Sequence, residues 1–286
     1  MQKPDWLKVN LNLNEFEKVS TLLSKLNLNV VCFHAACPNI GECFSKHTAT
    51  FLILGNICTR NCAFCSIQKG NPLSPDPNEP KNVAQAVKEL EIKHTVITSV
   101  TRDDLPDFGV SQFVKTIHAI RHLKLQTIIE VLIPDFKGSL SALESIVEAK
   151  PELINHNLET VPRLYSAIRP QANYRTSLEI LRQVKELNAN IYTKSGIMVG
   201  LGETEEEIIS LMRDLRRVNC DILTVGQYLQ PSKKQIEVVE YIKQATFQKL
   251  KSIGESMGFL YVNSGPFVRS SFNAKEFSEK FIQKKG

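Results

Sequence analysis

From residue 48 onward, the chain alternates short β-rich apolar runs with longer segments in which apolar residues recur every three or four positions. The short runs are typical of buried strands, and the longer periodicity is typical of amphipathic helices. The predicted strands span 48–56, 94–100, 126–134, 152–159, 192–202 and 222–231. The predicted helices span 82–92, 111–123, 139–149, 176–188, 204–219 and 245–258. Thr204 and Glu207 have the spacing of a capping box, which marks the start of the fifth helix.

This regular order of a strand followed by a helix predicts a parallel sheet with right-handed crossovers. The sheet is either doubly wound or curled into a barrel. Several predicted strands end in polar residues, as at Asn56, Ser99, Asp135 and Gln227. Active sites of β/α barrels lie at the carboxyl ends of their strands. We therefore predict an α/β fold with a partial (β/α)6 barrel of the TIM type.

The predicted barrel occupies residues 48–257 and leaves one side open. An N-terminal extension, 1–47, and a C-terminal extension, 258–286, flank it and could cover that side. A chain of 286 residues is near the upper end for one domain. No dinucleotide or Walker glycine loop is present in the sequence, which argues against nucleotide binding by those routes.

Composition narrows the class of protein. Apolar residues make up 42% of the chain and charged residues 23%, and no apolar run is long enough for a membrane span, so we expect a globular protein that binds no membrane. The start of the sequence has neither a secretory signal nor a transit peptide, which favours the cytoplasm. The net charge of +5 comes without a basic stripe interleaved with aromatic residues, so no nucleic-acid partner is expected.

The seven cysteines change the picture, because six of them fall within residues 32–65. An odd count in a reducing compartment favours metal ligands or reactive thiols over a disulfide framework. Cys58, Cys62 and Cys65 have the spacing C-x3-C-x2-C just after the first predicted strand. Three thiolates without a fourth suit a [4Fe–4S] cluster with one open iron, while zinc and a chance grouping of thiols stay open as alternatives.

A second trio, Cys32, Cys37 and Cys43, lies upstream with the spacing C-x4-C-x5-C, and it again lacks a fourth thiolate. Near the other end of the chain, the stretch "GPFVRSS" carries Arg269 and two serines in a segment without helical periodicity. The seventh cysteine, Cys220, follows a helix and precedes an apolar strand, so we expect it to be a packed thiol.

The first trio, placed after the first strand of a β/α barrel, resembles the radical S-adenosylmethionine (SAM) superfamily. Longer stretches narrow the resemblance to the lipoyl synthase family and cover roughly residues 30 to 275. These stretches are "NHNLETVPRLY", "RPQANYRTSLEIL", "TKSGIMVGLGETEEEI", "MRDLRRVNCDILTVGQYLQPS" and "GPFVRSS".

The resemblance implies two [4Fe–4S] clusters and SAM as cofactors. Cys58, Cys62 and Cys65 would hold the cluster that binds SAM. The auxiliary cluster would be held by the upstream trio and a serine oxygen, for which the family pattern points to Ser271 ahead of Ser270. Arg269 is implied as a catalytic residue that stabilises the serine oxygen, with a surface salt bridge as the alternative. Phe272 stands where the family usually has tyrosine, so a phenolic role there is in doubt.

Candidate contacts for SAM lie at strand ends. Asn157, Glu159 and Arg169 could hold its ribose or carboxylate, although structural hydrogen bonds explain these residues equally well. The run Arg102-Asp103-Asp104 after the second strand could serve SAM or shape an acyl tunnel. Among the histidines, His156 lies nearest the presumed mouth of the barrel.

The implied reaction inserts sulfur at carbons 6 and 8 of an octanoyl chain on a carrier lysine, using deoxyadenosyl radicals and sulfide from the auxiliary cluster. The implied partners are the glycine cleavage H protein, the lipoyl domains of 2-oxo acid dehydrogenases, an electron donor and an iron–sulfur carrier protein. One alternative is another two-cluster radical SAM enzyme that inserts sulfur, such as a methylthiotransferase. A further alternative, an electron carrier without catalysis, would leave the barrel without a role.

Overall fold

The computed structural model describes residues 4, 7, 13–34, 37, 39, 43, 50–272 and 274–282. Its centre is one sheet with the strand order β1-β2-β5-β6-β7-β8-β9-β10. The parallel strands are β2 (Thr50–Ile53), β5 (His94–Ser99), β6 (Ile128–Leu132), β7 (Leu153–Asn155), β8 (Tyr192–Val199), β9 (Ile222–Gln227) and β10 (Tyr261–Gly265). The short β1 (Asn29–Val30) pairs antiparallel with β2. The described strands form no closed barrel, because β1 and β10 stay as two separate edges.

The prediction of an α/β fold with a partial barrel is confirmed, and all six predicted strands are present. The sequence analysis did not predict β10, which pairs parallel with β9 from within the segment 258–286. Only one residue of β10, Val262, is buried, so the strand lacks a continuous apolar run. Its place in the sheet depends on backbone pairing, as in the register of Val262 with Leu223.

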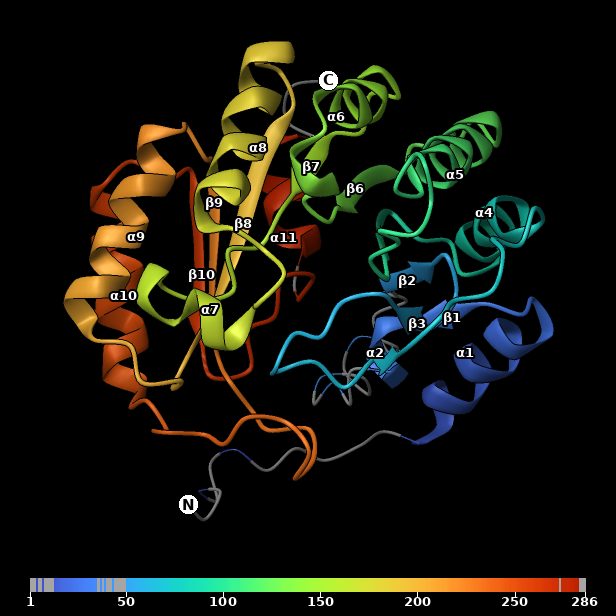
Figure 1. The fold of residues 1–286 in the computed structure, drawn as a ribbon. Coiled ribbons are helices and arrows are strands. Elements are labelled where there is room, and N and C mark those ends of the chain that lie inside the picture. Colours follow the sequence, from blue (N-terminus) through green and yellow to red (C-terminus); the bar gives the residue numbers. More distant parts are fainter. Residues whose placement is uncertain are drawn as a thin grey trace.

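Helices cover the outer side of the curved sheet (Figure 1). They are α4 (Glu79–Glu89), α5 (Val110–His122), α6 (Leu140–Glu148), α8 (Tyr174–Leu187), α9 (Glu205–Arg217) and α10 (Gln244–Ser256). The predicted capping box starts α9, since Thr204 Oγ1 accepts from the Glu207 amide and the Glu207 carboxylate accepts from the Thr204 amide. Among the helices of the described part of the chain, none has the length and apolar character that a membrane crossing requires.

Each of these helices buries one apolar face against the strands. Phe113 and Ile117 of α5 pack with Ile97 and Val131 in one core, and Leu211 of α9 belongs to a second core under β8 and β9. Burying a side chain of this size contributes about 1.5–3 kcal/mol. The two cores pack the helices against the strands and so fix the positions of the strands. The strand ends are therefore rigid positions for the residues of a site.

Shorter elements complete the structure. They are α1 (Leu13–Lys25), α2 (Val31–His34), α7 (Tyr165–Ile168), α11 (Ala274–Phe281), the 3-10 turns at Phe136–Gly138 and Pro162–Leu164, and a two-stranded ladder of β3 (Ile57–Cys58) and β4 (Gln68–Lys69). Phe277 of α11 packs against Leu153 and Ile222, which are the first residues of β7 and β9. The helix α11 therefore lies against the amino ends of the strands.

Candidate functional site

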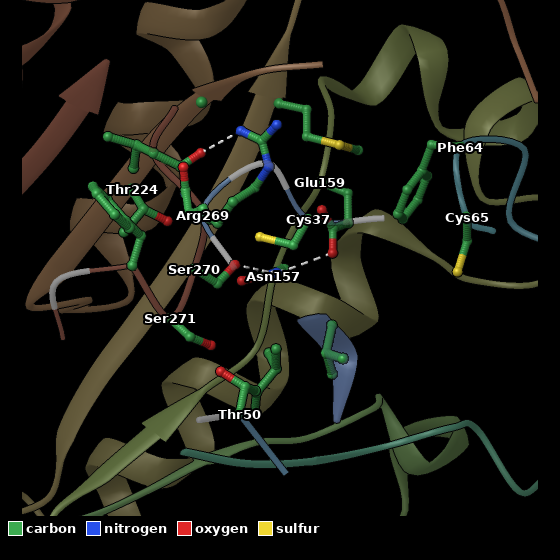
Figure 2. Close-up of a pocket in the computed structure, with 18 of the residues that line it drawn as sticks. Cys37, Thr50, Phe64, Cys65, Asn157, Glu159, Thr224, Arg269, Ser270 and Ser271 are labelled. Atoms are coloured by element: carbon green, nitrogen blue, oxygen red, sulfur yellow. Dashed lines mark hydrogen bonds between the residues drawn. The ribbon is translucent and has the colours of Figure 1, made fainter. Parts of the chain in front are cut away.

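A cavity of about 640 Å³ lies at the carboxyl ends of the strands. Its lining brings together the upstream trio, Cys65 of the first trio, and residues from both flanking segments. The predicted site residues that line it are Cys32, Cys37, Cys43, Cys65, Asn157, Glu159, Arg269, Ser270 and Ser271. Figure 2 shows Cys65 on one side and the segment of Arg269, Ser270 and Ser271 on the other, with Asn157 and Glu159 between them. The site thus has two parts that share one cavity.

The loop of the first trio is held at several points. Cys58 lies in β3 and not in irregular loop, and its carbonyl accepts from the Gly70 amide at 3.1 Å. The Ala63 amide donates to the Ile168 carbonyl at 2.9 Å, and the Ala63 carbonyl accepts from the Ile236 amide at 3.1 Å. These contacts place Cys62 and Cys65 between α7 and the segment after β9.

The upstream trio reaches the C-terminal segment through Asn39. Its side-chain amide donates to the Phe267 carbonyl at 2.6 Å, across 228 positions of sequence. Two backbone hydrogen bonds support the turn around it, from Cys37 to the Cys32 carbonyl and from Cys43 to the Asn39 carbonyl. The cysteines and the serines predicted as ligands of the auxiliary cluster therefore lie beside each other.

The segment of Arg269 and the serines lies across β9, and Gly226 makes this possible. A Cβ atom at Gly226 would come within 2.0 Å of the Val268 carbonyl oxygen. Ser270 Oγ accepts from Asn157 Nδ2 at 2.6 Å, whereas no hydrogen bond to the Ser271 hydroxyl occurs among the described residues. Arg269 donates to the Val268 carbonyl at 2.7 Å. Burial lowers the pKa of Arg269, while the Cys37 thiol opposes that effect.

The protonation of the thiols shows what kind of group this donor set suits. Burial and the neighbours Cys37 and Cys43 raise the pKa of Cys32 to about 12. Burial, followed by the thiols at Cys62 and Cys58, raises the pKa of Cys65 to about 12. Such thiols ionise only beside a compensating positive charge, and a ligand-binding thiol must be ionised. Once ionised, the soft sulfur donors of both trios are the ligand type that iron–sulfur clusters take.

Among the described residues, no three His, Cys, Asp or Glu side chains are arranged to share a single metal ion. In an iron–sulfur cluster each cysteine thiolate binds a different iron, so a cluster does not require three side chains around one ion.

Asn157 and Glu159 form the middle of the cavity. Asn157 Nδ2 donates to Glu159 Oε1 at 3.0 Å as well as to Ser270, and Asn157 Oδ1 is buried without a partner in the described structure (Figure 2). The backbone of Glu159 has a left-handed φ of 67°, and it forms an isolated parallel β-bridge with Ile197 of β8. Burial raises the pKa of Glu159, and the nearby Arg169 opposes this shift.

Arg169 lies behind this pair and does not line the cavity. Its Nη1 donates to the Asn157 carbonyl at 2.9 Å and to the Tyr165 hydroxyl at 2.8 Å, and its Nε is buried without a hydrogen bond. Burial raises the pKa of Cys62, and the charge of Arg169 is the largest effect that opposes the rise. Arg169 therefore supports the backbone of Asn157 and acts on Cys62 by charge.

Other candidates from the sequence have structural partners. Asp103 accepts from Arg60, and Asp104 accepts from Arg102, so this run does not face the cavity. The two ring nitrogens of His156 lie 2.8 Å from the Ile133 carbonyl oxygen and 2.9 Å from Ser177 Oγ, and burial lowers its pKa to about 4. Cys220 is fully buried in the second core, as predicted for a packed thiol.

Comparison with known proteins decides the family. A model of the radical SAM superfamily matches residues 52–215. The lipoyl synthase of Caldanaerobacter subterraneus subsp. tengcongensis is 55% identical over 274 residues, which cover 96% of this chain and 96% of the relative. The lipoyl synthase of Alkaliphilus metalliredigens is 53% identical over 288 residues, which cover 99% and 98%. The chain belongs to the lipoyl synthase family.

Solved structures agree with this lipoyl synthase assignment at the level of the fold. Methylornithine synthase has a TM-score of 0.55 at 13% identity and covers 96% of this chain and 84% of its own. Streptococcus suis SuiB bound to S-adenosylmethionine has a TM-score of 0.58 at 13% identity, with 85% and 58% covered. At these identities the likeness concerns the fold alone, which this lipoyl synthase family member shares with both structures.

Sequence reasoning missed three contributors to the site of this lipoyl synthase family member. Asn39, Arg60 and Gly226 carry no motif of their own, because each acts through a partner far along the chain. The sequence offers one signal for two of them, because Arg60 and Asn39 each lie between two predicted cysteine ligands.

Proposed function

We propose that this chain converts a protein-bound N6-octanoyl-lysine to lipoyl-lysine by inserting sulfur at carbons 6 and 8. The observation that carries the proposal is the single cavity onto which Cys65 of one trio and all of the other trio open, beside Ser270 and Ser271. Two sulfur insertions on one acyl chain need a radical source and a sulfur source within reach of the same carbons. The full-length likeness to lipoyl synthases supports the same reaction.

Cys58, Cys62 and Cys65 would hold one [4Fe–4S] cluster, and Cys32, Cys37, Cys43 and Ser271 would hold the other. When bound, SAM and the first cluster supply 5′-deoxyadenosyl radicals, and the second cluster supplies sulfur. Within the described part of the chain the Ser271 hydroxyl makes no hydrogen bond, which supports its choice over Ser270, whose oxygen already accepts from Asn157. An alkoxide is a harder ligand than thiolate and a poorer match for soft iron–sulfur chemistry, so it can detach. Arg269 would offset the charge of the serine oxygen.

Asn157 and Glu159 are proposed to bind SAM, since both residues line the cavity, where Glu159 offers a half-buried carboxylate and Asn157 a carbonyl oxygen without a partner among the described residues. Arg169 would act on that site by its charge and by holding the Asn157 backbone. The amino and hydroxyl groups of SAM are donors, and they would satisfy these acceptors.

The acyl chain would lie along the apolar part of the lining. Leu52, Leu132 and Ile197 contribute side chains from β2, β6 and β8, and Phe272 closes the C-terminal side. These apolar side chains would exclude water from that part of the cavity, which protects a carbon radical from side reactions. The total of about 640 Å³ falls within the range of about 300–1,000 Å³ that is usual for small-molecule sites.

The proposed partners are lipoyl carrier proteins, namely the glycine cleavage H protein and the lipoyl domains of 2-oxo acid dehydrogenases. An electron donor and an iron–sulfur carrier protein complete the set, because the first cluster must be reduced and the second rebuilt. A cytoplasmic location is also proposed, and it is supported by the fact that all seven cysteines are free of disulfides.

The test is anaerobic reconstitution with iron and sulfide, followed by mass spectrometry of an octanoyl-lysine peptide incubated with SAM and a reductant. We expect a mass gain of two sulfurs less two hydrogens and two deoxyadenosines per product. Deoxyadenosine without any change in the peptide would refute sulfur insertion into this substrate, and methylthio-adenosine formed in tRNA would support the alternative enzyme class.

Variants separate the two trios in the same assay. Cys62→Ser should abolish SAM cleavage, because an incomplete cluster cannot present an open iron. Cys37→Ser should still cleave SAM but form no lipoyl product. Cys220→Ser, which changes a buried thiol outside the cavity, is the matched control and should keep both reactions. Lipoyl product from Cys37→Ser would contradict the role of the auxiliary trio.

A further inference from the structure

Arg60 lies between Cys58 and Cys62, yet its side chain points away from solvent and is only 5% exposed. Its guanidinium binds two carboxylates at once. Nε and Nη2 donate to the two oxygens of Asp103 at 2.7 and 3.0 Å. Nη1 and Nη2 donate to the two oxygens of Asp135 at 2.7 and 2.5 Å. Two bidentate contacts fix both the position and the plane of the guanidinium.

The two carboxylates come from neighbouring parallel strands. Asp103 lies in the loop after β5, and its backbone amide donates to Thr59 Oγ1 at 3.1 Å. Asp135 lies just after β6, where its side chain also accepts from the Lys137 amide at 3.0 Å. Both carboxylates are therefore attached to strand ends that the core holds rigidly, and Arg60 transfers that rigidity to the loop of the first trio.

The contacts of Arg60 complement those on the other side of the loop. Ala63 is held there by the backbone at Ile168 and Ile236, and Gln235 Nε2 donates to the Cys65 carbonyl at 3.3 Å. Among the described residues, further hydrogen bonds on the Cys58 half of the loop run from Thr59 to the Thr101 carbonyl and between β3 and β4. The Arg60 amide itself lies 3.4 Å from Cys58 Sγ, so a shift of this residue moves a predicted ligand directly.

A buried ion pair is a poor source of net stability, because the cost of desolvation offsets much of the attraction. Its usual benefit is a fixed geometry. We propose that Arg60 is a positioning residue for the radical SAM cluster: its double fork to Asp103 and Asp135 holds Cys58, Cys62 and Cys65 in the arrangement that retains the cluster and binds SAM. This inference rests on the function proposed above.

The test compares Arg60→Lys with Arg102→Lys. Lysine keeps the charge but cannot form two planar bidentate contacts. Arg102 is a matched control, because it is 1% exposed and binds both oxygens of Asp104, while its remaining hydrogen bond goes to the Leu54 carbonyl. Asp103→Asn is a milder second variant that leaves Asp135 in place, in case Arg60→Lys does not fold.

Each change is placed in a Cys37→Ser background, so that iron content and the electron paramagnetic resonance spectrum report the first cluster alone. A parallel set in a Cys62→Ser background reports the auxiliary cluster. The measurements are the rate of iron loss to a chelator, the change in the spectrum on addition of SAM, the affinity for SAM and the melting temperature of the cluster-free protein.

We expect Arg60→Lys to lose the first cluster roughly 10- to 100-fold faster than Arg102→Lys and to bind SAM more weakly by a similar factor. The auxiliary cluster should be retained equally in both variants. Equal retention of the first cluster by both variants would overturn the proposal, and so would parallel loss of both clusters with Arg60→Lys, since that pattern marks a general defect of the fold. Absence of any cluster at the first trio in the parent protein would refute the proposed function instead.

Discussion

At the scale of single residues, the site depends on small differences between neighbours. Ser270 and Ser271 are adjacent and both line the cavity, but only the Ser270 oxygen is engaged by Asn157. Gly196 keeps this contact possible, because a Cβ atom there would lie 2.9 Å from both Asn157 Oδ1 and Ser270 Oγ. One serine is thus held by the protein, and the next remains available as a ligand.

We therefore expect Ser271→Ala to change the spectrum of the auxiliary cluster and to lower the yield of lipoyl product strongly. Ser270→Ala should leave that spectrum unchanged, because it removes only an acceptor for Asn157. Mössbauer spectra of the protein in a Cys62→Ser background measure the first effect, and mass spectrometry of the peptide in the native background measures the second. A changed spectrum with Ser270→Ala alone would assign the ligand to Ser270.

At the scale of elements, a buried polar cluster joins four strands and one helix below the cavity. Glu130 of β6 is fully buried and accepts from Lys194 of β8 at 3.0 Å and from Asn155 of β7 at 3.1 Å. One ring nitrogen of His94 at the start of β5 lies 3.1 Å from a Glu130 oxygen, and the other lies 3.1 Å from Ser278 Oγ of α11. Although burial raises the pKa of Glu130, Lys194 and His94 outweigh it and lower that pKa to about 2.

Replacing Glu130 should destabilise the fold more than its size suggests. Glu130→Gln leaves Lys194 as a buried charge without a partner, which typically costs about 3–5 kcal/mol in the free energy of unfolding. The double variant Glu130→Gln with Lys194→Met should recover much of that loss. Urea unfolding of the parent protein, both single variants and the double variant at neutral pH measures both effects, and additive losses in the double variant would contradict the coupling.

The same residue predicts a dependence on pH. Because the folded pKa of Glu130 lies below the ordinary value of 4.5, its contribution to stability is complete above that value and is lost as the pH falls toward 2. Glu130→Gln should therefore flatten this part of the stability curve, which unfolding measured at several acidic pH values can establish. An unchanged slope would place the acid sensitivity in other carboxylates.

Elements were easier to predict from the sequence than contacts between them. The six strands with apolar runs and the capping box of α9 could be found locally, whereas β10 could not, since three of its five residues are Asn263, Ser264 and Gly265. The cysteines were recognisable by spacing. The fork of Arg60 was not, because its acceptors lie 43 and 75 positions away, and the place of Asp103 in the sequence suggests a contact with SAM or the acyl tunnel instead.

At the scale of the whole molecule, both flanking segments meet at the cavity. The hydrogen bond from Asn39 to the Phe267 carbonyl joins the loop of the upstream trio to the segment that carries Ser271. Asn39 is buried and Phe267 is half-buried, so the interaction is partly shielded from water. The site proposed for the auxiliary cluster would therefore be made from two segments that are distant in sequence and touch only in the folded protein.

Asn39→Ala should weaken this junction. A buried carbonyl that loses its partner costs about 1–3 kcal/mol, and here the loss falls on the auxiliary site. We expect faster loss of iron to a chelator from the auxiliary cluster and no change for the first cluster. Asn82→Ala is the matched control, since Asn82 donates to the Leu26 carbonyl at 3.0 Å and neither residue lines the cavity. Equal iron loss in the two variants would contradict the assignment.

The bond between Asn39 and Phe267 also bears on how the protein is made. A ribosome delivers the chain from its amino terminus, and folding follows as segments emerge. Every contact described for the loop of Cys58, Cys62 and Cys65 is available once residue 236 has emerged. The upstream cysteines are synthesised first, yet their partner arrives 228 positions after Asn39. During synthesis, these thiols therefore wait longest for the site proposed for them, and the auxiliary cluster would be loaded only after the segment of Phe267 has emerged.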